Sequence, residues 1–137
     1  MKKLITILAA ALLVFGVVSC ASTKEIPENL TAAQLFQGGQ DAYSDGNYKQ
    51  AEAYYNKILD MYGDNIDTYI EAKYELGHLY VKTKDYKKAF DTLTEVLSLY
   101  EADITGTLPA SFKKLSTIEL QKIPEPKLTA LIQESQK

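Results

Sequence analysis

Residues 39–51 (GQDAYSDGNYKQA) and residues 77–89 (GHLYVKTKDYKKA) are two versions of one pattern. Aligned on Ala51 and Ala89, the two stretches lie 38 residues apart. At that offset three further pairs of like residues fall into register: Gly39 with Gly77, Tyr48 with Tyr86, and Ile58 with Val96. A glycine, an aromatic residue and an alanine that recur at fixed separations indicate one structural unit used twice.

The sequence around these stretches has the periodicity of amphipathic helices. Apolar residues recur at three- and four-residue spacing in two runs: Ala51, Tyr54, Tyr55, Ile58, Leu59 and Tyr62, then Ala89, Phe90, Leu93, Val96, Leu97 and Tyr100. The capping pattern Ser/Thr-x-x-Glu/Gln occurs at Thr31–Gln34 and at Thr68–Glu71 and predicts two helix starts. We expect helices near 32–45, 48–62, 67–83 and 86–101. The small residues Gly39, Ala51, Gly77 and Ala89 would let the paired helices approach closely.

The two units resemble the tetratricopeptide repeat (TPR), a helix–turn–helix of about 34 residues. The resemblance covers about residues 31–101 and implies an all-α solenoid of about two antiparallel helix pairs. Several positions depart from the family pattern: Leu35 and Lys73 replace its tryptophan, Lys84 stands where the first unit has the turn glycine Gly46, and Gly63 and Glu101 replace the closing proline. The longer connection around residues 62–67 is similar to linkers in TPR envelope lipoproteins of the β-barrel assembly and Tol–Pal coordinator kind.

The C-terminal part, residues 102–137, is expected to cover the end of the solenoid, because two repeats alone bury too little apolar surface. Residues 109–120 form a short amphipathic segment after a loop at 105–108, and Pro126 suits the first turn of a last helix through Gln133. In that helix Leu128, Leu131 and Ile132 lie on one side. The alternative is that this tail docks on a partner or on a second copy.

Residues 1–19 have the order of a secretory signal peptide: a basic start, an apolar run from Leu4 to Val18, and small residues before Cys20. This exit resembles a bacterial lipobox, which implies that Cys20 is lipidated and becomes the first residue of the mature chain. Fatty acyl chains such as palmitate would then hold the protein on a membrane. Two alternatives are an uncleaved membrane anchor and a Cys20 that is an ordinary small residue.

Residues 20–30 are expected to be the lipidated N-terminus and a polar tether that lifts the domain off the bilayer. Ala21, rather than Asp, follows the cysteine. By resemblance to enteric lipoprotein sorting, this residue favours the outer membrane, with the domain facing the periplasm.

Composition disfavours several classes of function. The formal charge of −3, without a basic cluster, argues against nucleic-acid binding. One Cys and one His argue against a disulfide framework and against a Cys- or His-based metal site. No glycine-rich phosphate loop and no nucleophile with a partner base is visible, so we expect neither a cofactor nor a catalytic site.

Candidate binding residues follow from the repeat pattern, which places the first helix of each unit on a concave face. That mapping selects six residues: Phe36, Gln40, Tyr43, Glu71, Tyr74 and His78. Mixed aromatic and polar groups of this kind suit an extended or helical peptide. All ten tyrosines lie between residues 43 and 100, and their rings are expected to fill helix crossings with the hydroxyls at the rim. A stacking surface for a glycan or peptide is the other interpretation.

The leading hypothesis is therefore a non-catalytic envelope lipoprotein that binds a protein or peptide partner through its repeats, in outer-membrane or cell-wall assembly. A lipoprotein that binds peptidoglycan or another glycan is the alternative. An enzyme is the weakest hypothesis, because it would need at least Glu71, Glu75 and His78 to converge on one spot. The partner and the oligomeric state are not specified by the sequence.

Overall fold

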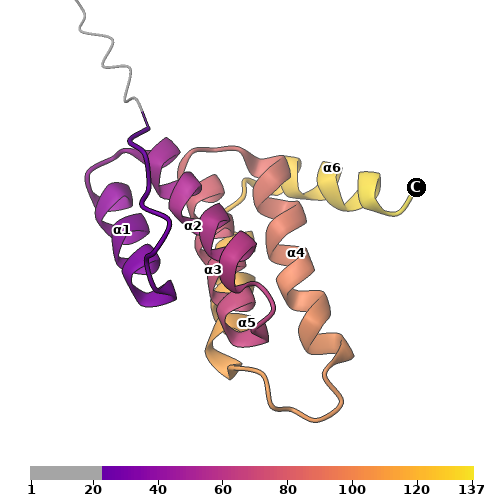
Figure 1. Cartoon of the computed structure of the whole chain (residues 1–137). Helices are drawn as coiled ribbons and strands as arrows, with labels where there is room; N and C mark the ends of the chain where they lie inside the picture. The colour runs from indigo at the N-terminus through magenta and orange to yellow at the C-terminus, as the bar shows by residue number, and fades with distance from the viewer. Residues whose placement is uncertain (1–22) are drawn as a thin grey trace, which may run out of the picture.

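The structure, a computed structural model, describes residues 23–137. Within that part the chain folds into a row of antiparallel helices (Figure 1): α1 (Ala32–Ser44), α2 (Tyr48–Tyr62), α3 (Ile66–Lys82), α4 (Tyr86–Ala102), α5 (Ala110–Gln121) and α6 (Glu125–Ser135). α1 packs on α2 and α3 packs on α4, while α2 joins the two pairs by packing on α3. The predicted all-α fold of antiparallel helix pairs is confirmed, and the first four helices differ from their expected bounds by no more than one residue at either end.

The helix starts depend on side chains that accept hydrogen bonds from the first backbone amides. At α1 the predicted capping box is present, with Thr31 and Gln34 each bonded to the other's backbone. The box predicted at Thr68 is wrong, because α3 begins earlier, at Ile66. Asn65 is its N-cap, and its Oδ1 accepts a hydrogen bond from the Thr68 amide at 2.9 Å. An asparagine cap does the same physical work as a threonine cap, since either side chain pairs an amide that the helix leaves free.

Two glycines allow the two helices of each pair to pack closely. A Cβ atom added to Gly39 would lie 2.5 Å from the Tyr55 ring, and one added to Gly77 would lie 2.6 Å from Leu93 Cγ. Both separations are far below van der Waals contact, so only glycine fits. Tyr55 and Leu93 are both fully buried, and each of these crossings is the centre of one repeat.

The tyrosines belong mainly to the packing between helices. None of the ten is exposed; Tyr55 and Tyr80 are buried and the other eight are half-buried. Their hydroxyls reach acceptors at the rim, as when Tyr80 donates to Glu52 Oε1 at 2.7 Å and Tyr100 donates to the Pro109 carbonyl at 2.7 Å. Each ring therefore contributes apolar area while its polar end stays paired.

The C-terminal helices continue the row. α5 packs on both α3 and α4, as the first helix of a further repeat would, and α6 packs on α4. Pro126 lies in the first turn of α6, as expected. On α5, Ser116 and Glu119 are buried, whereas Leu115 and Ile118 are 37% and 40% exposed. The partners of α5 explain this, because its buried side meets polar groups of α3.

The segment before α1 lies against the domain. Gln50 holds Lys24 by two hydrogen bonds, of 2.5 Å from the Lys24 amide and 3.0 Å to its carbonyl. Tyr62 donates to the Leu30 carbonyl at 2.7 Å, and Ile26 and Leu30 pack on the core. Residues 24–30 are therefore docked along α2 rather than a free tether, because their carbonyls find donors on that helix.

The predicted signal peptide, Cys20 and Ala21 lie outside the described residues. Among residues 23–137, no helix is both long enough and apolar enough to cross a membrane.

Candidate peptide-binding groove

Three of the six predicted residues meet where α1 and α3 face each other. The rings of Tyr43 and His78 have centroids 5.1 Å apart, and those of Tyr74 and His78 stack at 6.2 Å. Tyr43 also meets Tyr48 edge-on at 5.5 Å. His78 is thus bracketed by one tyrosine from its own helix and one from α1, which forms a short aromatic row across two repeats.

Helix α5 adds a third side to this row. Phe112 lies 5.5 Å from the Tyr74 ring, and Glu119 Oε1 lies 3.0 Å from His78 Nδ1. The His78–Glu119 approach is short enough for an ion pair, but its direction does not satisfy hydrogen-bond geometry, and both His78 Nδ1 and Glu119 Oε2 lack a hydrogen-bond partner among the described residues. Glu119 is almost fully buried and is also paired with Lys122 at 2.5 Å. We call the face of α1, α3 and α5 that carries Tyr43, Tyr74, Glu71, Glu75 and His78 the groove.

Two further carboxylates lie on the same face of α3. Burial raises the pKa of Glu75 above its usual range, although the nearby His78 and hydrogen bonds from Gln40 and Tyr55 favour its charged form. Burial, followed by repulsion from Glu75, raises the pKa of Glu71. Carboxylates held together in partly dry surroundings gain from a cation brought beside them.

Burial and the nearby carboxylates also raise the pKa values of the tyrosines. Burial, and then the charges of Glu119 and Glu75, raises the pKa of Tyr74 to about 12. The pKa of Tyr43 is raised as well, first by burial and then by its neighbours Tyr48, Glu119 and Glu75. Both phenols therefore stay neutral donors at physiological pH, beside a group of negative charges.

The structure brings some of the six predicted residues together and places another elsewhere. Tyr43, Tyr74 and His78 are in contact, Gln40 reaches the row through Glu75, and Glu71 adjoins Glu75. Phe36 packs instead against the hydrophobic core.

Sequence reasoning did not place Glu75 or Glu119 in the site. For Glu75 a signal existed, because Glu71, Glu75 and His78 follow the spacing of one helix face. For Glu119 there was none, since only the packing of α5 on α3 brings it to His78. Of the three residues that an enzyme would need at one spot, Glu75 lies near both His78 and Glu71. Even so, no group of three or more His, Cys, Asp or Glu in residues 23–137 could hold a metal ion.

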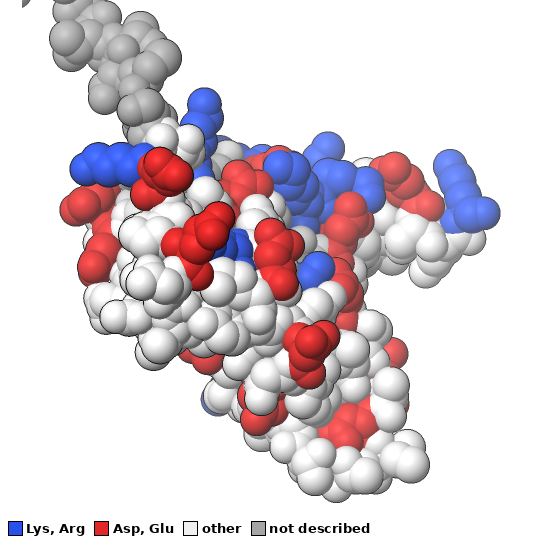
Figure 2. Space-filling view, viewed as in Figure 1, with Lys and Arg blue, Asp and Glu red and all other residues white. Residues whose placement is uncertain are grey.

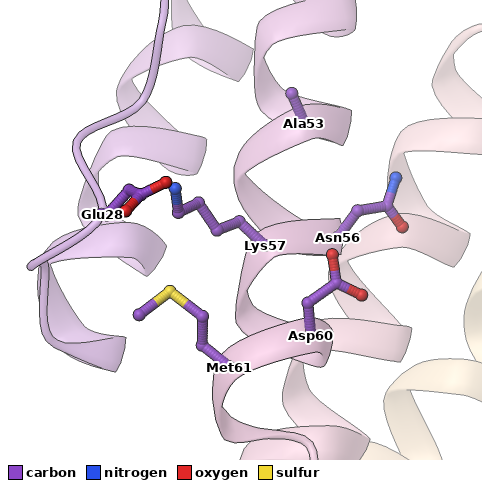
Figure 3. Close-up of a pocket in the computed structure, with 6 residues that line it drawn as sticks. All are labelled: Glu28, Ala53, Asn56, Lys57, Asp60 and Met61. Atoms are coloured by element: carbon purple, nitrogen blue, oxygen red, sulfur yellow. The ribbon is translucent and has the colours of Figure 1, made fainter.

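A separate pocket of about 470 Å³ lies against α2 (Figure 3). It is lined by Glu28, Ala53, Asn56, Lys57, Asp60 and Met61. In Figure 3 the Lys57 side chain extends toward Glu28, and its ammonium donates to the Ile26 carbonyl at 3.1 Å. Glu28 lines this pocket only because residues 24–30 lie against α2, and no pattern in the sequence predicts that contact.

Antiparallel helix pairs that stack in one row, with a glycine where α1 crosses α2 and where α3 crosses α4, define a helical-repeat protein. The tetratricopeptide repeat family matches residues 30–102. The chain belongs to this family, whose repeats bind protein partners, and the match assigns no catalytic activity. The described helices α1 to α4 fall within the matched range.

A relative is known from Treponema pallidum (strain Nichols), where it is an uncharacterized protein. It is 37% identical over 117 residues, which cover 83% of this chain and 47% of the relative. The chain thus spans about half the length of that relative. No solved structure matches this chain.

Proposed function

We propose that this chain is a non-catalytic, lipid-anchored adaptor of the bacterial cell envelope, which recruits a protein partner in outer-membrane or cell-wall assembly. Family membership supports the binding of a protein. The lipobox-like residues before and at Cys20, followed by Ala21, support anchoring in the outer membrane facing the periplasm. No cofactor is required for this role.

One observation carries the binding proposal: the aromatic row of Tyr43, Tyr74 and His78 lies beside the half-buried carboxylates Glu71 and Glu75 of α3. Aromatic rings offer apolar contact area, and carboxylates offer acceptors for Lys or Arg. The partner segment that fits is an extended or helical peptide with an apolar side chain next to a basic one.

Charge reversal tests this assignment. Glu71→Lys places an ammonium in the groove, where it would repel a basic peptide while relieving the repulsion between Glu71 and Glu75. Glu101→Lys is the matched control, because Glu101 is exposed near the end of α4, away from the groove. We expect the tagged full-length chain, purified from its native membranes, to lose its co-purifying protein at least about tenfold with Glu71→Lys, a loss of about 1.4 kcal/mol. Equal losses with both variants would refute the groove assignment.

The anchor has its own test. A chain with Cys20 intact should incorporate a labelled fatty acid and partition into detergent, whereas Cys20→Ser should do neither. Incorporation that is unchanged in Cys20→Ser would contradict the lipoprotein proposal while leaving peptide binding untouched.

A second candidate is binding of a glycan or a peptidoglycan fragment, which the half-buried rings of Tyr43 and Tyr74 favour because sugars stack on such rings. Retention of the protein on purified sacculi, lost when Tyr74 is replaced by alanine, would support it. A protein that co-purifies in stoichiometric amount and no retention on sacculi would exclude it.

A further inference from the structure

One end of the molecule carries a row of exposed lysines. At this end α1 turns into α2, α3 turns into α4 and α5 turns into α6, and in Figure 1 it lies uppermost. Figure 2 shows lysines along the same upper edge. The residues at these turns, which we call the lysine edge, are Lys49, Lys82, Lys84, Lys87, Lys88 and Lys122.

Three of the six lysines of this edge form an ion pair within residues 23–137, and three do not. Lys87 pairs with Asp91 at 2.7 Å, Lys88 pairs with Glu52 at 3.5 Å and Asp85 at 3.7 Å, and Lys122 pairs with Glu119. Lys49, Lys82 and Lys84, by contrast, form no ion pair with any residue between 23 and 137. Three carboxylates also lie at the turns of this end: Asp45 is the C-cap of α1, Asp85 is the N-cap of α4 and Glu125 begins α6. Figure 2 shows acidic residues between the lysines along this edge.

The opposite end is acidic. Five carboxylates lie in the turn between α2 and α3, in the loop after α4, or in the adjoining helix ends: Asp60, Asp64, Asp67, Glu101 and Asp103. Lys113 and Lys114, near the start of α5, are the lysines closest to that loop in sequence. The two ends are separated by the length of α2, whose 15 residues span about 22 Å. The chain is therefore polarised along its helices.

Lys84 occupies a backbone conformation that is unfavourable for a residue with a side chain. Its φ is +63°, in the left-handed region, and the equivalent turn of the first repeat has Gly46 at +75°. A side chain costs about 1 kcal/mol there relative to glycine. A residue that keeps a long cationic side chain at such a position is a candidate for a functional role at this edge.

The N-terminal segment enters at the same end. Gln50, in the first turn of α2, holds both the amide and the carbonyl of Lys24. Cys20 precedes Lys24 by four residues, and four residues of chain reach at most about 14 Å. A lipid on Cys20 would therefore lie beside the lysine edge and away from the acidic end.

We propose that the lysine edge faces a phospholipid bilayer that contains anionic headgroups, with the helices standing upright on it. This inference rests on the proposed lipid anchor. The short link from Cys20 brings the edge to the surface, and the attraction between its unpaired lysines and anionic lipid fixes the orientation. The row of repeats then runs along the membrane, and the groove between α1, α3 and α5 opens sideways to the periplasm.

The test measures which end of the lipidated full-length chain lies near the membrane. Asp45→Cys and Asp64→Cys place a single free thiol at the two ends, because acylation blocks the Cys20 thiol. Each is labelled with a fluorescent donor, and the lipidated protein is inserted into phosphatidylcholine vesicles, with or without phosphatidylglycerol, that carry a headgroup acceptor. In anionic vesicles we expect the Asp45→Cys label to be quenched much more strongly than the Asp64→Cys label. Equal quenching, or the reverse order, would overturn the proposal.

Substitutions separate the effect of charge from that of the short link. One lysine near an anionic surface changes the population of an orientation roughly fivefold, so Lys82→Gln with Lys84→Gln should weaken the preference roughly 25-fold. Lys113→Gln with Lys114→Gln removes the same charge near the other end and should leave it unchanged. The preference should also fall in pure phosphatidylcholine and at high salt. An orientation preference that does not change with lipid charge, with salt or with the substitutions at Lys82 and Lys84 would refute electrostatic docking.

The outcomes for the anchor and the adaptor remain distinct. A chain that partitions into detergent but shows no orientation contradicts this inference alone. A chain that carries no lipid contradicts the anchor and this inference together. Partner recovery should survive Lys82→Gln with Lys84→Gln, because the groove lies on the sides of the helices. Loss of the partner with wild-type orientation would contradict the adaptor alone.

Discussion

Gly39 offers a direct test of how the first repeat is packed, because its neighbour Gly38 provides a matched control in the same helix. A Cβ at Gly39 would meet the Tyr55 ring at 2.5 Å, and one at Gly38 would meet the Tyr54 ring at 2.6 Å. The two rings differ in freedom: Tyr55 is 1% exposed and hydrogen-bonded to Glu75, whereas Tyr54 is half-buried at the surface.

The expected free energies of unfolding differ accordingly. Replacing a glycine inside a helix by alanine stabilises it by about 1 kcal/mol in either position. Forcing a methyl group into a packed core costs about 1–3 kcal/mol, and at Gly39 the ring of Tyr55 has nowhere to move. We therefore expect Gly39→Ala to destabilise the protein by up to about 2 kcal/mol. Gly38→Ala should be neutral or stabilising by up to about 1 kcal/mol, because the Tyr54 ring can swing outward.

Urea denaturation followed by circular dichroism would measure both free energies under the same conditions. The Gly39→Ala midpoint should fall below that of the wild type, and the Gly38→Ala midpoint should not. If Gly39→Ala proved as stable as Gly38→Ala, the close crossing of α1 and α2 over a fixed Tyr55 would be refuted.

Further predictions concern the turn, the docked segment and the groove. Lys84→Gly should stabilise the fold by up to about 1 kcal/mol in the same urea assay, since glycine adopts the left-handed turn without strain; a loss of stability would contradict this. Tyr62→Phe removes the hydroxyl that donates to the Leu30 carbonyl, and should make residues 24–30 more sensitive to limited proteolysis while α-helical content stays constant. Glu71→Gln should raise stability at pH 7, because burial and Glu75 raise the pKa of Glu71 in the folded protein. The gain should shrink as the pH falls through that raised pKa and vanish below the ordinary glutamate pKa of 4.5. A gain independent of pH would show that the Glu71 charge is not the cause.

The repeated part of the chain was predictable because its information is local. Helix periodicity, the cap at Thr31 and the glycines at both crossings are visible in neighbouring residues, and the structure places α1 to α4 within one residue of the expected bounds. The error at α3 concerns its cap: two residues that can cap a helix, Asn65 and Thr68, lie close together, and the structure uses Asn65.

What the sequence did not reveal depends on contacts between distant segments. The pairing of α5 with α3 determines that Glu119 is buried while Leu115 and Ile118 are half-exposed, and apolar periodicity alone does not predict a buried glutamate. Residues 24–30 look like a polar tether, yet Gln50 and Tyr62 bind their backbone. The aromatic part of the groove was predictable because the repeat pattern places Tyr43, Tyr74 and His78 on corresponding helices. Its wall from α5 was not predictable, because it depends on the packing of α5 against α3.

The central claim is that the groove recruits a protein. It is tested most directly by a photo-crosslinking amino acid placed at single positions in the living cell. Substitution at Tyr74 places the probe in the groove, and substitution at Met61 places it in the pocket on α2 as a control. The account predicts one crosslinked protein species from position 74 and none from position 61. A partner captured from position 61 and not from position 74 would contradict it.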